Sequence, residues 1–155
     1  MSAKKLAIIA TKGTLDWAYP PFILASTAAA LGYETRMFFT FYGLRLLRKK
    51  LDLKVSSVGN PAMPMPLPLP VMLQGFPGMQ SIMTSMMKKK IRDKGVASIE
   101  ELRQLSLEAG VQMIGCQMTI DLFDFSRDDF IEGIDYGGAA TFLEFAGESD
   151  VNLFI

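Results

Sequence analysis

The sequence contains no histidine and only one cysteine, Cys116, among its 155 residues. Without histidine the chain lacks the commonest general base and the commonest metal ligand, and it cannot form a Ser–His or Cys–His nucleophile pair. One cysteine forms no internal disulfide, and without histidine it cannot build a zinc site by itself. Any reaction must therefore use the thiol, carboxylates, lysines, hydroxyls or backbone groups, and we expect neither a metal site nor a cofactor.

The sequence also lacks the pattern of a signal peptide. Lys4 and Lys5 are followed by only five apolar residues, Leu6 to Ala10, whereas a signal peptide has a longer apolar region that ends at a small-residue cleavage site. A single free thiol is typical of a reducing compartment. We therefore expect the protein to be cytoplasmic.

The net charge is zero, but the two signs are unevenly distributed along the chain. Residues 1–95 hold 14 basic and 4 acidic side chains, and residues 96–155 hold 2 and 12. Two basic clusters, Arg45 to Lys50 and Lys88 to Lys94, would be explained by solvated helix ends, or by a docking face for an acidic partner or an anion. Aromatic residues do not interleave them in a nucleic-acid pattern, so we expect no nucleic acid partner.

The middle of the chain is rich in proline and methionine. Residues 55–87 contain no charged side chain, six of the eight prolines and seven of the eleven methionines. Prolines at every second position from 64 to 70 exclude a helix or a central strand, and they interrupt the ~20 apolar residues that a membrane span needs. We interpret residues 55–95 as an insertion in a single domain, 1–155. It could pack on its own subunit, cover a partner surface through its methionines, or contact a membrane surface through residues 61–87.

Short apolar segments alternate with helical segments. The predicted strands are residues 4–10, 33–40, 111–115, 133–136 and 151–155. The predicted helices are residues 17–33, 41–50, 77–94, 98–109, 116–123, 126–132 and 137–145. This alternation predicts an α/β domain of three layers, α/β/α, with a mainly parallel five-stranded sheet. Ligands of such sheets gather at the carboxyl ends of the strands, here residues 11–16, residues 40–42, Cys116 and Gly137-Gly138.

Three of the predicted helices carry expectations about burial. Pro20 and Pro21 are expected in the first turn of the uncharged helix 17–33, which should be buried in the core or at a subunit interface. A capping box at Ser98 and Glu101 predicts the start of helix 98–109. The apolar stripe expected for helix 77–94 is Met79, Ile82, Met83, Met86 and Met87. The stripe expected for helix 98–109 is Ile99, Leu102, Leu105 and Ala109.

Cys116 lies where a predicted strand changes directly into a helix. The thiolate is the nucleophilic form of cysteine, and a helix N-terminus lowers the pKa of a thiol through its free N–H groups. Such a site suits a persulfide, whose charged outer sulfur backbone N–H groups can hold, and Lys12 could approach it if the first strand is adjacent. A lone cysteine that is simply buried in the core is the structural alternative. The candidate anion-binding residues are Lys12, Gly13, Gly115, Gln117, Gly137 and Gly138.

Several stretches carry a family resemblance. Residues 115–122 (GCQMTIDL), 130–143 (FIEGIDYGGAATFL) and 151–155 (VNLFI), and a Met/Pro segment followed by Lys88-Lys89-Lys90, resemble the DsrE/DsrF/DsrH sulfur-relay superfamily, in its peroxiredoxin-like DsrE branch. The resemblance covers nearly the whole chain. It implies a DsrE-like α/β/α fold, homo-oligomers (often trimers or hexamers) and cytoplasmic sulfur trafficking. It also implies that Cys116 carries sulfane sulfur as a persulfide and exchanges it with small TusA-type carriers and rhodaneses.

The chain departs from the family pattern in two ways. Some members have a second cysteine near the first, and this chain has none, so its sulfur would have to pass to a partner thiol. Phe123-Asp124 also stand where the family pattern has a Met-Gly pair, so we expect a local shape different from that of the family. Nothing forms the Pro/Thr/Arg setting that activates a peroxide-reducing cysteine, which argues against the peroxiredoxin label.

The sequence thus predicts a sulfur carrier that acts through a Cys116 persulfide. Whether it also turns over as a sulfurtransferase stays open. One alternative is a non-catalytic binding or scaffold module that uses the Met/Pro segment and the basic clusters. Another is a protein that binds a small anion or nucleotide through Lys12 and Gly137-Gly138.

Overall fold

The computed structural model describes residues 2–56 and 75–155. The elements are β1 (Lys5–Ala10), α1 (Leu15–Ala30), β2 (Glu34–Phe39), the 3₁₀ helix η1 (Phe41–Leu47), α2 (Met79–Asp93), α3 (Ile99–Glu108), β3 (Gln112–Cys116), α4 (Gln117–Leu122), the 3₁₀ helix η3 (Arg127–Asp129), β4 (Asp135–Gly137), α5 (Ala139–Gly147) and β5 (Val151–Phe154). Every predicted strand is present. Most of the insertion's proline-rich part, residues 57–74, lies outside the described residues.

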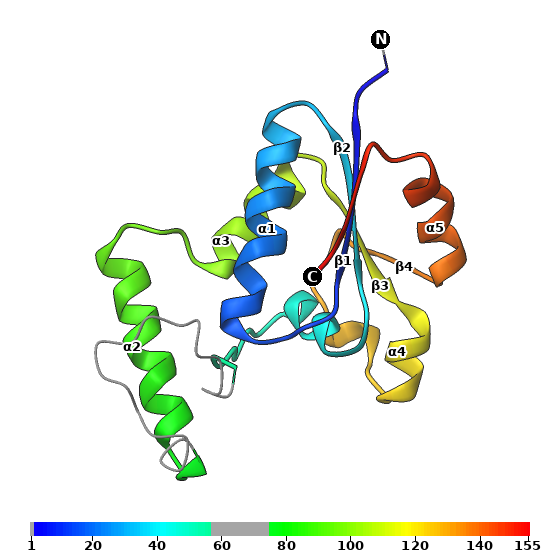
Figure 1. Ribbon diagram of the computed structural model, residues 1–155. Helices are drawn as coiled ribbons and strands as arrows, with labels where there is room; N and C mark the ends of the chain where they lie inside the picture. The colour runs from blue at the N-terminus through cyan, green and yellow to red at the C-terminus, as the bar shows by residue number, and fades with distance from the viewer. Residues whose placement is uncertain (1, 57–74) are drawn as a thin grey trace.

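The five strands form one sheet in the order β4-β3-β2-β1-β5, and every neighbouring pair is parallel. Figure 1 shows α1 and α3 on one side of this sheet and α5 on the other, with α4 and η1 at the edge where the strands end. The predicted three-layer α/β/α domain is therefore confirmed. The order places β3 between β2 and β4 and separates it from β1, which decides what can surround Cys116.

Two hydrophobic cores lie on the two faces of the sheet, because successive strand residues point to opposite sides. The larger core lies on the side of α1 and includes Ile8, Met37 and Met113, all fully buried. The smaller core lies on the side of α5 and consists of Ala7, Phe38, Ile114, Cys116, Phe142 and Phe145. The cysteine side chain is thus part of the thinner layer.

The start of α1 differs from the prediction. The helix begins at Leu15, so Pro20 and Pro21 lie in its second turn, and their expected place in the first turn is wrong. The Ala18 N–H donates to the Thr14 carbonyl at 2.9 Å, which closes the first turn before the prolines. The prolines remove two helical hydrogen bonds, and packing of the following apolar residues on the sheet maintains the helix.

Burial of α1 is one-sided. Ala18, Phe22 and Ala25 are fully buried against the sheet, whereas Ile23 and Leu24 are exposed. Burial on all sides within the core, one of the two expectations for this uncharged helix, is therefore not met. A subunit interface on the exposed side stays a prediction.

The apolar stripes of α2 and α3 are only partly buried. In α2, Met83 is buried, but Ile82 and Met86 are exposed. In α3, Ile99 is buried, but Leu105 is 52% exposed, and Arg103 is buried in its place. The reason for the shift in α3 is a pair of hydrogen bonds, because Nη1 of Arg103 donates at 2.8 Å to each of two carbonyls at the end of η1, those of Leu46 and Arg48.

Two further features bear on the sequence predictions. The capping box that begins α3 is present, since the Glu101 N–H donates to the Ser98 hydroxyl at 3.2 Å and the Ser98 N–H donates to the Glu101 carboxylate at 2.7 Å. None of the helices in the described ranges, 2–56 and 75–155, combines the length and apolar character required to traverse a bilayer.

Candidate functional site

Cys116 is the last residue of β3 and the N-cap of α4, with φ −67° and ψ 112°. The predicted junction of strand and helix is therefore confirmed. Its side chain is 4% exposed and packs with the smaller core, beside Phe38 and Ile114. In the sheet Cys116 pairs with Gly137 of β4. The thiol thus lies just below the surface at the carboxyl edge of the sheet.

The surroundings of the sulfur favour the thiolate. Burial raises the pKa of the Cys116 thiol, but the hydroxyl and N–H of Thr119, the hydroxyl of Thr40 and the N–H of Met118 lower it more, and the pKa lies below the ordinary thiol value. Within the described part of the chain the Cys116 side chain forms no capping hydrogen bond, so these groups act on the sulfur as neighbouring dipoles. Several dipoles, rather than one charged neighbour, polarise the sulfur.

Thr40 and Thr119 form a hydroxyl pair beside the thiol. Their Oγ1 atoms are 3.2 Å apart, and the Phe41 N–H donates to Oγ1 of Thr119 at 3.1 Å. Phe41 has a φ of +49°, a left-handed conformation that is rare and strained for a bulky residue. The buried Thr119 therefore connects the thiol to a strained backbone position at the end of β2.

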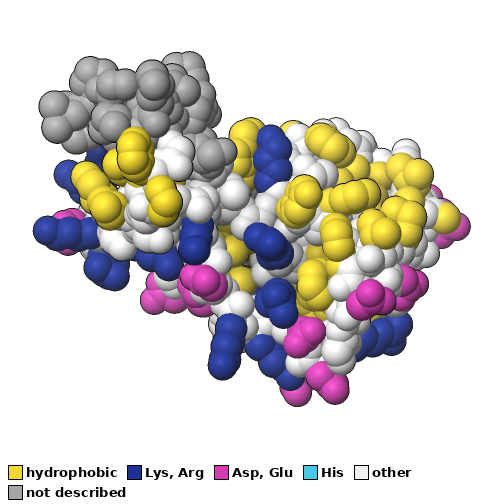
Figure 2. Space-filling view, turned by 90° about the horizontal axis from the view of Figure 1, so that it is seen from below, with side chains coloured by type: hydrophobic (Ala, Val, Ile, Leu, Met, Phe, Trp, Pro, Cys, Tyr) yellow, Lys and Arg dark blue, Asp and Glu magenta, His cyan; other side chains and the backbone are white. Residues whose placement is uncertain are grey.

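Exposed apolar side chains lie near the Thr40–Thr119 pair. We call them the apolar rim; its members are Phe41, Tyr42, Met118, Leu122 and Phe123. The centre of the Phe123 ring lies 6.3 Å from the centre of the Phe41 ring and 6.4 Å from that of the Tyr42 ring. Residues that follow β2 and residues that follow β3 are therefore in contact in the rim. Figure 2 views the edge where the strands end and shows hydrophobic side chains gathered on the side away from α2. Contiguous exposed apolar surface of this kind marks interaction sites.

The glycines predicted to lie near Cys116 fall into two groups. Gly137 is the direct sheet partner of Cys116, and Gly138 is the N-cap of α5, so both lie at the neighbouring strand end as expected. Gly115 has a packing role, because a Cβ atom there would lie 3.3 Å from a methyl group of Leu44. Gly13 also packs, since a Cβ atom would collide with the carbonyl oxygen of Tyr42.

Lys12 is not brought to the thiol. It follows β1, and β2 lies between β1 and β3, so the adjacency that its approach to Cys116 requires is absent. The Lys12 ammonium instead lies 3.1 Å from the centre of the Trp17 ring. The structure therefore separates Lys12 from Gly137-Gly138, the residues that the anion- or nucleotide-binding alternative requires together.

Gln117 leads to a residue that the sequence prediction missed. Its amide nitrogen donates to Asp121 at 2.7 Å, and its amide oxygen accepts from Nη2 of Arg127 at 2.7 Å. The Arg127 guanidinium also lies 4.4 Å from the centre of the Tyr136 ring. Both ends of the Gln117 amide are thus hydrogen-bonded, and the cation of this network is Arg127. Arg127 lies ten residues farther along the chain, so no local sequence spacing indicates the contact.

Thr119 was also missed, although a local signal was present. It occupies the third helical position after the N-cap Cys116, which is where an N-cap side chain meets backbone N–H groups. Thr40 lies in the segment 40–42, which was expected among the strand ends. Across the described residues, no group of three or more cysteine, aspartate and glutamate side chains is arranged to hold a metal ion.

Comparisons with known proteins find similar chains. The sulfur carrier protein DsrE2 of Allochromatium vinosum is 65% identical over 159 residues, which cover 100% of both chains. The uncharacterized protein YrkE of Bacillus subtilis is 31% identical and covers 98% of this chain and 97% of its own. The crystal structure of the YchN protein of E. coli has the same fold, with a TM-score of 0.57 at 12% identity and with 98% and 99% of the two chains covered.

The family itself follows from a match along almost the entire sequence. The model described as the DsrE/DsrF/DrsH-like family covers residues 2–154, which includes every strand of the parallel sheet and the junction that holds Cys116. With this match, and with a relative that is 65% identical over its full length, the chain belongs to the DsrE/DsrF/DrsH-like family.

Proposed function

We propose that this protein is a sulfur carrier that holds sulfane sulfur as a persulfide on Cys116. The observation that carries the proposal is the lowered pKa of this thiol, the only one in the chain, at the carboxyl edge of a parallel sheet. The name of the 65% identical relative, a sulfur carrier protein, supports the same function. The family match gives the fold that would present the cysteine.

Loading requires a donor persulfide and no redox partner. The Cys116 thiolate attacks the outer sulfur of a donor R–S–SH, the donor S–S bond breaks, and R–S⁻ leaves as the Cys116–S–SH bond forms. An acceptor thiolate then attacks the outer sulfur of Cys116–S–SH, and the Cys116 thiolate leaves. Because the chain has no second cysteine, this release step must be intermolecular.

Burial sets a condition on both steps. Cys116 is only 4% exposed, so a donor can reach its sulfur only if neighbouring side chains move. Once loaded, the outer sulfur extends about 2 Å beyond Sγ, which is the length of an S–S bond. The same thiol that is hard to load would therefore hold its transferable sulfur closer to the surface.

The apolar rim supports protein partners for this exchange. Phe41, Tyr42 and Phe123 offer aromatic surface around the thiol, and buried aromatic residues commonly anchor protein interfaces. We propose that small carriers of the TusA type or rhodaneses dock there. A single free thiol suits the reducing cytoplasm, where we propose that the exchange takes place.

We further propose a homo-oligomer, a trimer or hexamer, with contacts on the α5 side. Phe154 of the edge strand β5 is 75% exposed, and Leu143 of α5 is also exposed beside an apolar hollow between these two elements.

Membrane-surface contact through residues 61–87 also stays a proposal. Residues 61–74 lie outside the described ranges, and its support is the exposure of Phe76, Ile82 and Met86.

A mass measurement tests the central proposal. Incubation with a persulfide-loaded carrier protein is expected to add 32 Da, about the mass of one sulfur atom, to the wild-type chain and nothing to Cys116→Ser, since no other thiol is present. Reduction with dithiothreitol should remove the added mass. A wild-type chain that stays unmodified with several loaded donors, while the donors load a control acceptor, contradicts the proposal.

The second candidate function is a scaffold in which Cys116 only packs, and the near-complete burial of the thiol favours it. It predicts that thiol reagents modify Cys116 slowly in the native protein and rapidly in denaturant. Sulfur carriage predicts modification of the native protein at a pH below the ordinary thiol pKa. Rates with iodoacetamide, measured with and without urea, separate the two.

A further inference from the structure

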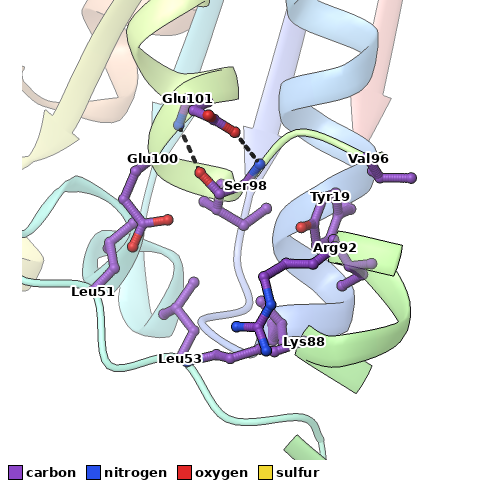
Figure 3. A pocket seen from close by; sticks show the side chains of 12 residues that line it. Tyr19, Leu51, Leu53, Lys88, Arg92, Val96, Ser98, Glu100 and Glu101 are labelled. Atoms are coloured by element: carbon purple, nitrogen blue, oxygen red, sulfur yellow. Dashed lines mark hydrogen bonds between the residues drawn. The ribbon is translucent and has the colours of Figure 1, made fainter. Parts of the chain in front are cut away.

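A cavity lies between α1, α2, α3 and the segment 51–53 (Figure 3). Its buried lining residues belong to the larger core, on the opposite side of the sheet from the Cys116 side chain. The volume of the cavity is about 350 Å³. Small-molecule sites commonly have ~300–1,000 Å³, so the space suits a small ligand. Neither the sulfur carriage proposed above nor any residue of the apolar rim involves this cavity.

The floor of the cavity is apolar and its walls are charged. Leu15, Leu53 and Ile99 are buried residues of the floor. Figure 3 shows the guanidinium of Arg92 and the carboxylate of Glu100 directed into the cavity from opposite sides. Apolar surface with a few convergent polar groups is the usual composition of a ligand site.

The charged groups are available to a ligand. Lys88 lies one helical turn before Arg92 on α2 and also lines the cavity. Among the residues that the structure describes, none of Lys88, Arg92 and Glu100 belongs to an ion pair. Glu101 differs, because its carboxylate already accepts the Ser98 N–H at 2.7 Å. The cavity therefore presents two unpaired cations and, opposite them, one unpaired carboxylate.

This arrangement selects a dipolar ligand. An anion would be attracted by Lys88 and Arg92 but repelled by Glu100, and a cation would meet the reverse. Burial raises the pKa of Tyr19, which also lines the cavity, and the negative charges of Glu100 and Glu101 raise it further. The field of these carboxylates therefore acts across the cavity. A molecule with a positive group at one end, a negative group at the other and an apolar body satisfies all three features.

We propose that the cavity binds a short apolar peptide with free termini. The amino terminus pairs with Glu100, the carboxylate pairs with Arg92 and Lys88, and the apolar side chains lie on Leu53 and Ile99. Charge-assisted hydrogen bonds at both ends fix the orientation, and the floor removes apolar surface from water.

The dipeptide Leu-Phe is the probe, with N-acetyl-Leu-Phe and Leu-Phe amide as ligands that each lack one charge. Calorimetry is expected to show saturable binding of Leu-Phe to the wild-type protein, about tenfold weaker for each capped form, since one charge-assisted contact is lost. Glu100→Gln should bind Leu-Phe and N-acetyl-Leu-Phe equally. Arg92→Gln should reduce the preference for Leu-Phe over its amide.

Matched variants control for changes in overall charge. Lys89→Gln on α2 and Glu108→Gln on α3 alter residues outside the cavity lining and should leave both preferences intact. Cys116→Ser should bind Leu-Phe like the wild type, so a failure of sulfur carriage does not affect this test. Absence of saturable Leu-Phe binding, capped peptides that bind as tightly as Leu-Phe, or preferences that Glu100→Gln and Arg92→Gln leave unchanged each overturn the proposal.

Discussion

Replacing Thr119 with valine tests how the fold polarises the Cys116 thiol. Valine has the shape of threonine and suits a fully buried position, but it removes the hydroxyl that stabilises the thiolate and accepts the Phe41 N–H. The Thr119 N–H, the Met118 N–H and the Thr40 hydroxyl remain. The substitution therefore raises the pKa of the thiol without removing every stabilising group.

The magnitude follows from the loss of one hydrogen bond to a charged acceptor. Such a bond contributes about 1.5–3 kcal/mol, and the Cys116 side chain forms no capping hydrogen bond, so the lower value applies. About 1.4 kcal/mol corresponds to a tenfold change in an equilibrium. At a pH well below the thiol pKa, Thr119→Val should thus hold about tenfold less thiolate than the wild type.

The assay is the rate of iodoacetamide alkylation as a function of pH. The pH at half-maximal rate reports ionisation of the thiol, whereas access to the buried sulfur scales the rate at every pH. For Thr119→Val the profile should move to higher pH, and the large difference from the wild type should disappear where both thiols are ionised. Thr119→Ser retains a hydroxyl and should keep the wild-type profile. An unshifted profile in Thr119→Val, with an unchanged circular dichroism spectrum, refutes the reasoning.

Two further predictions concern stability. Arg103→Ala should lower the free energy of unfolding by about 3 kcal/mol in urea titrations, because it leaves the carbonyls of Leu46 and Arg48 without their donor. An equal loss in Gln104→Ala, a variant at an exposed site, would contradict this origin. For Asp16, burial raises the pKa, but hydrogen bonds, chiefly from the hydroxyl and N–H of Ser56, together outweigh it, and the pKa lies below the ordinary value. The stability contributed by Asp16 is therefore present above the carboxyl pKa of the unfolded chain and is lost as the pH falls through the pKa of the folded protein. Asp16→Asn should flatten the acid limb of the profile of unfolding free energy against pH. An acid limb as steep as that of the wild type would refute this origin.

Local patterns carried most of the fold. The apolar runs 4–10 and 111–115 predicted strands, and the capping box at Ser98 predicted the start of α3, because each of these signals depends on residues close in sequence. Cys116 could be placed at a strand-to-helix junction for the same reason. The function implied by the family resemblance, sulfur carriage, is the one in the name of the 65% identical relative.

Burial of individual helix residues could not be predicted as well. An apolar stripe selects Leu105 for the core, yet the carbonyls of Leu46 and Arg48 at the end of η1 require a donor. Arg103 is buried there instead. The first-turn rule for proline likewise fails at Pro20 and Pro21, because a hydrogen bond and packing elsewhere in α1 determine where the helix begins.

The sequence by itself determined that any thiol chemistry of this protein must use Cys116 without help from a histidine or a second cysteine, since the chain has neither. It also determined the alternation of strands and helices, which depends on short-range periodicity. Only the tertiary structure decided which groups surround that thiol. The order of strands in the sheet separates Lys12 from Cys116 and brings Thr40 next to Thr119, 79 residues away, because strand pairing is a long-range choice made by packing of the whole core.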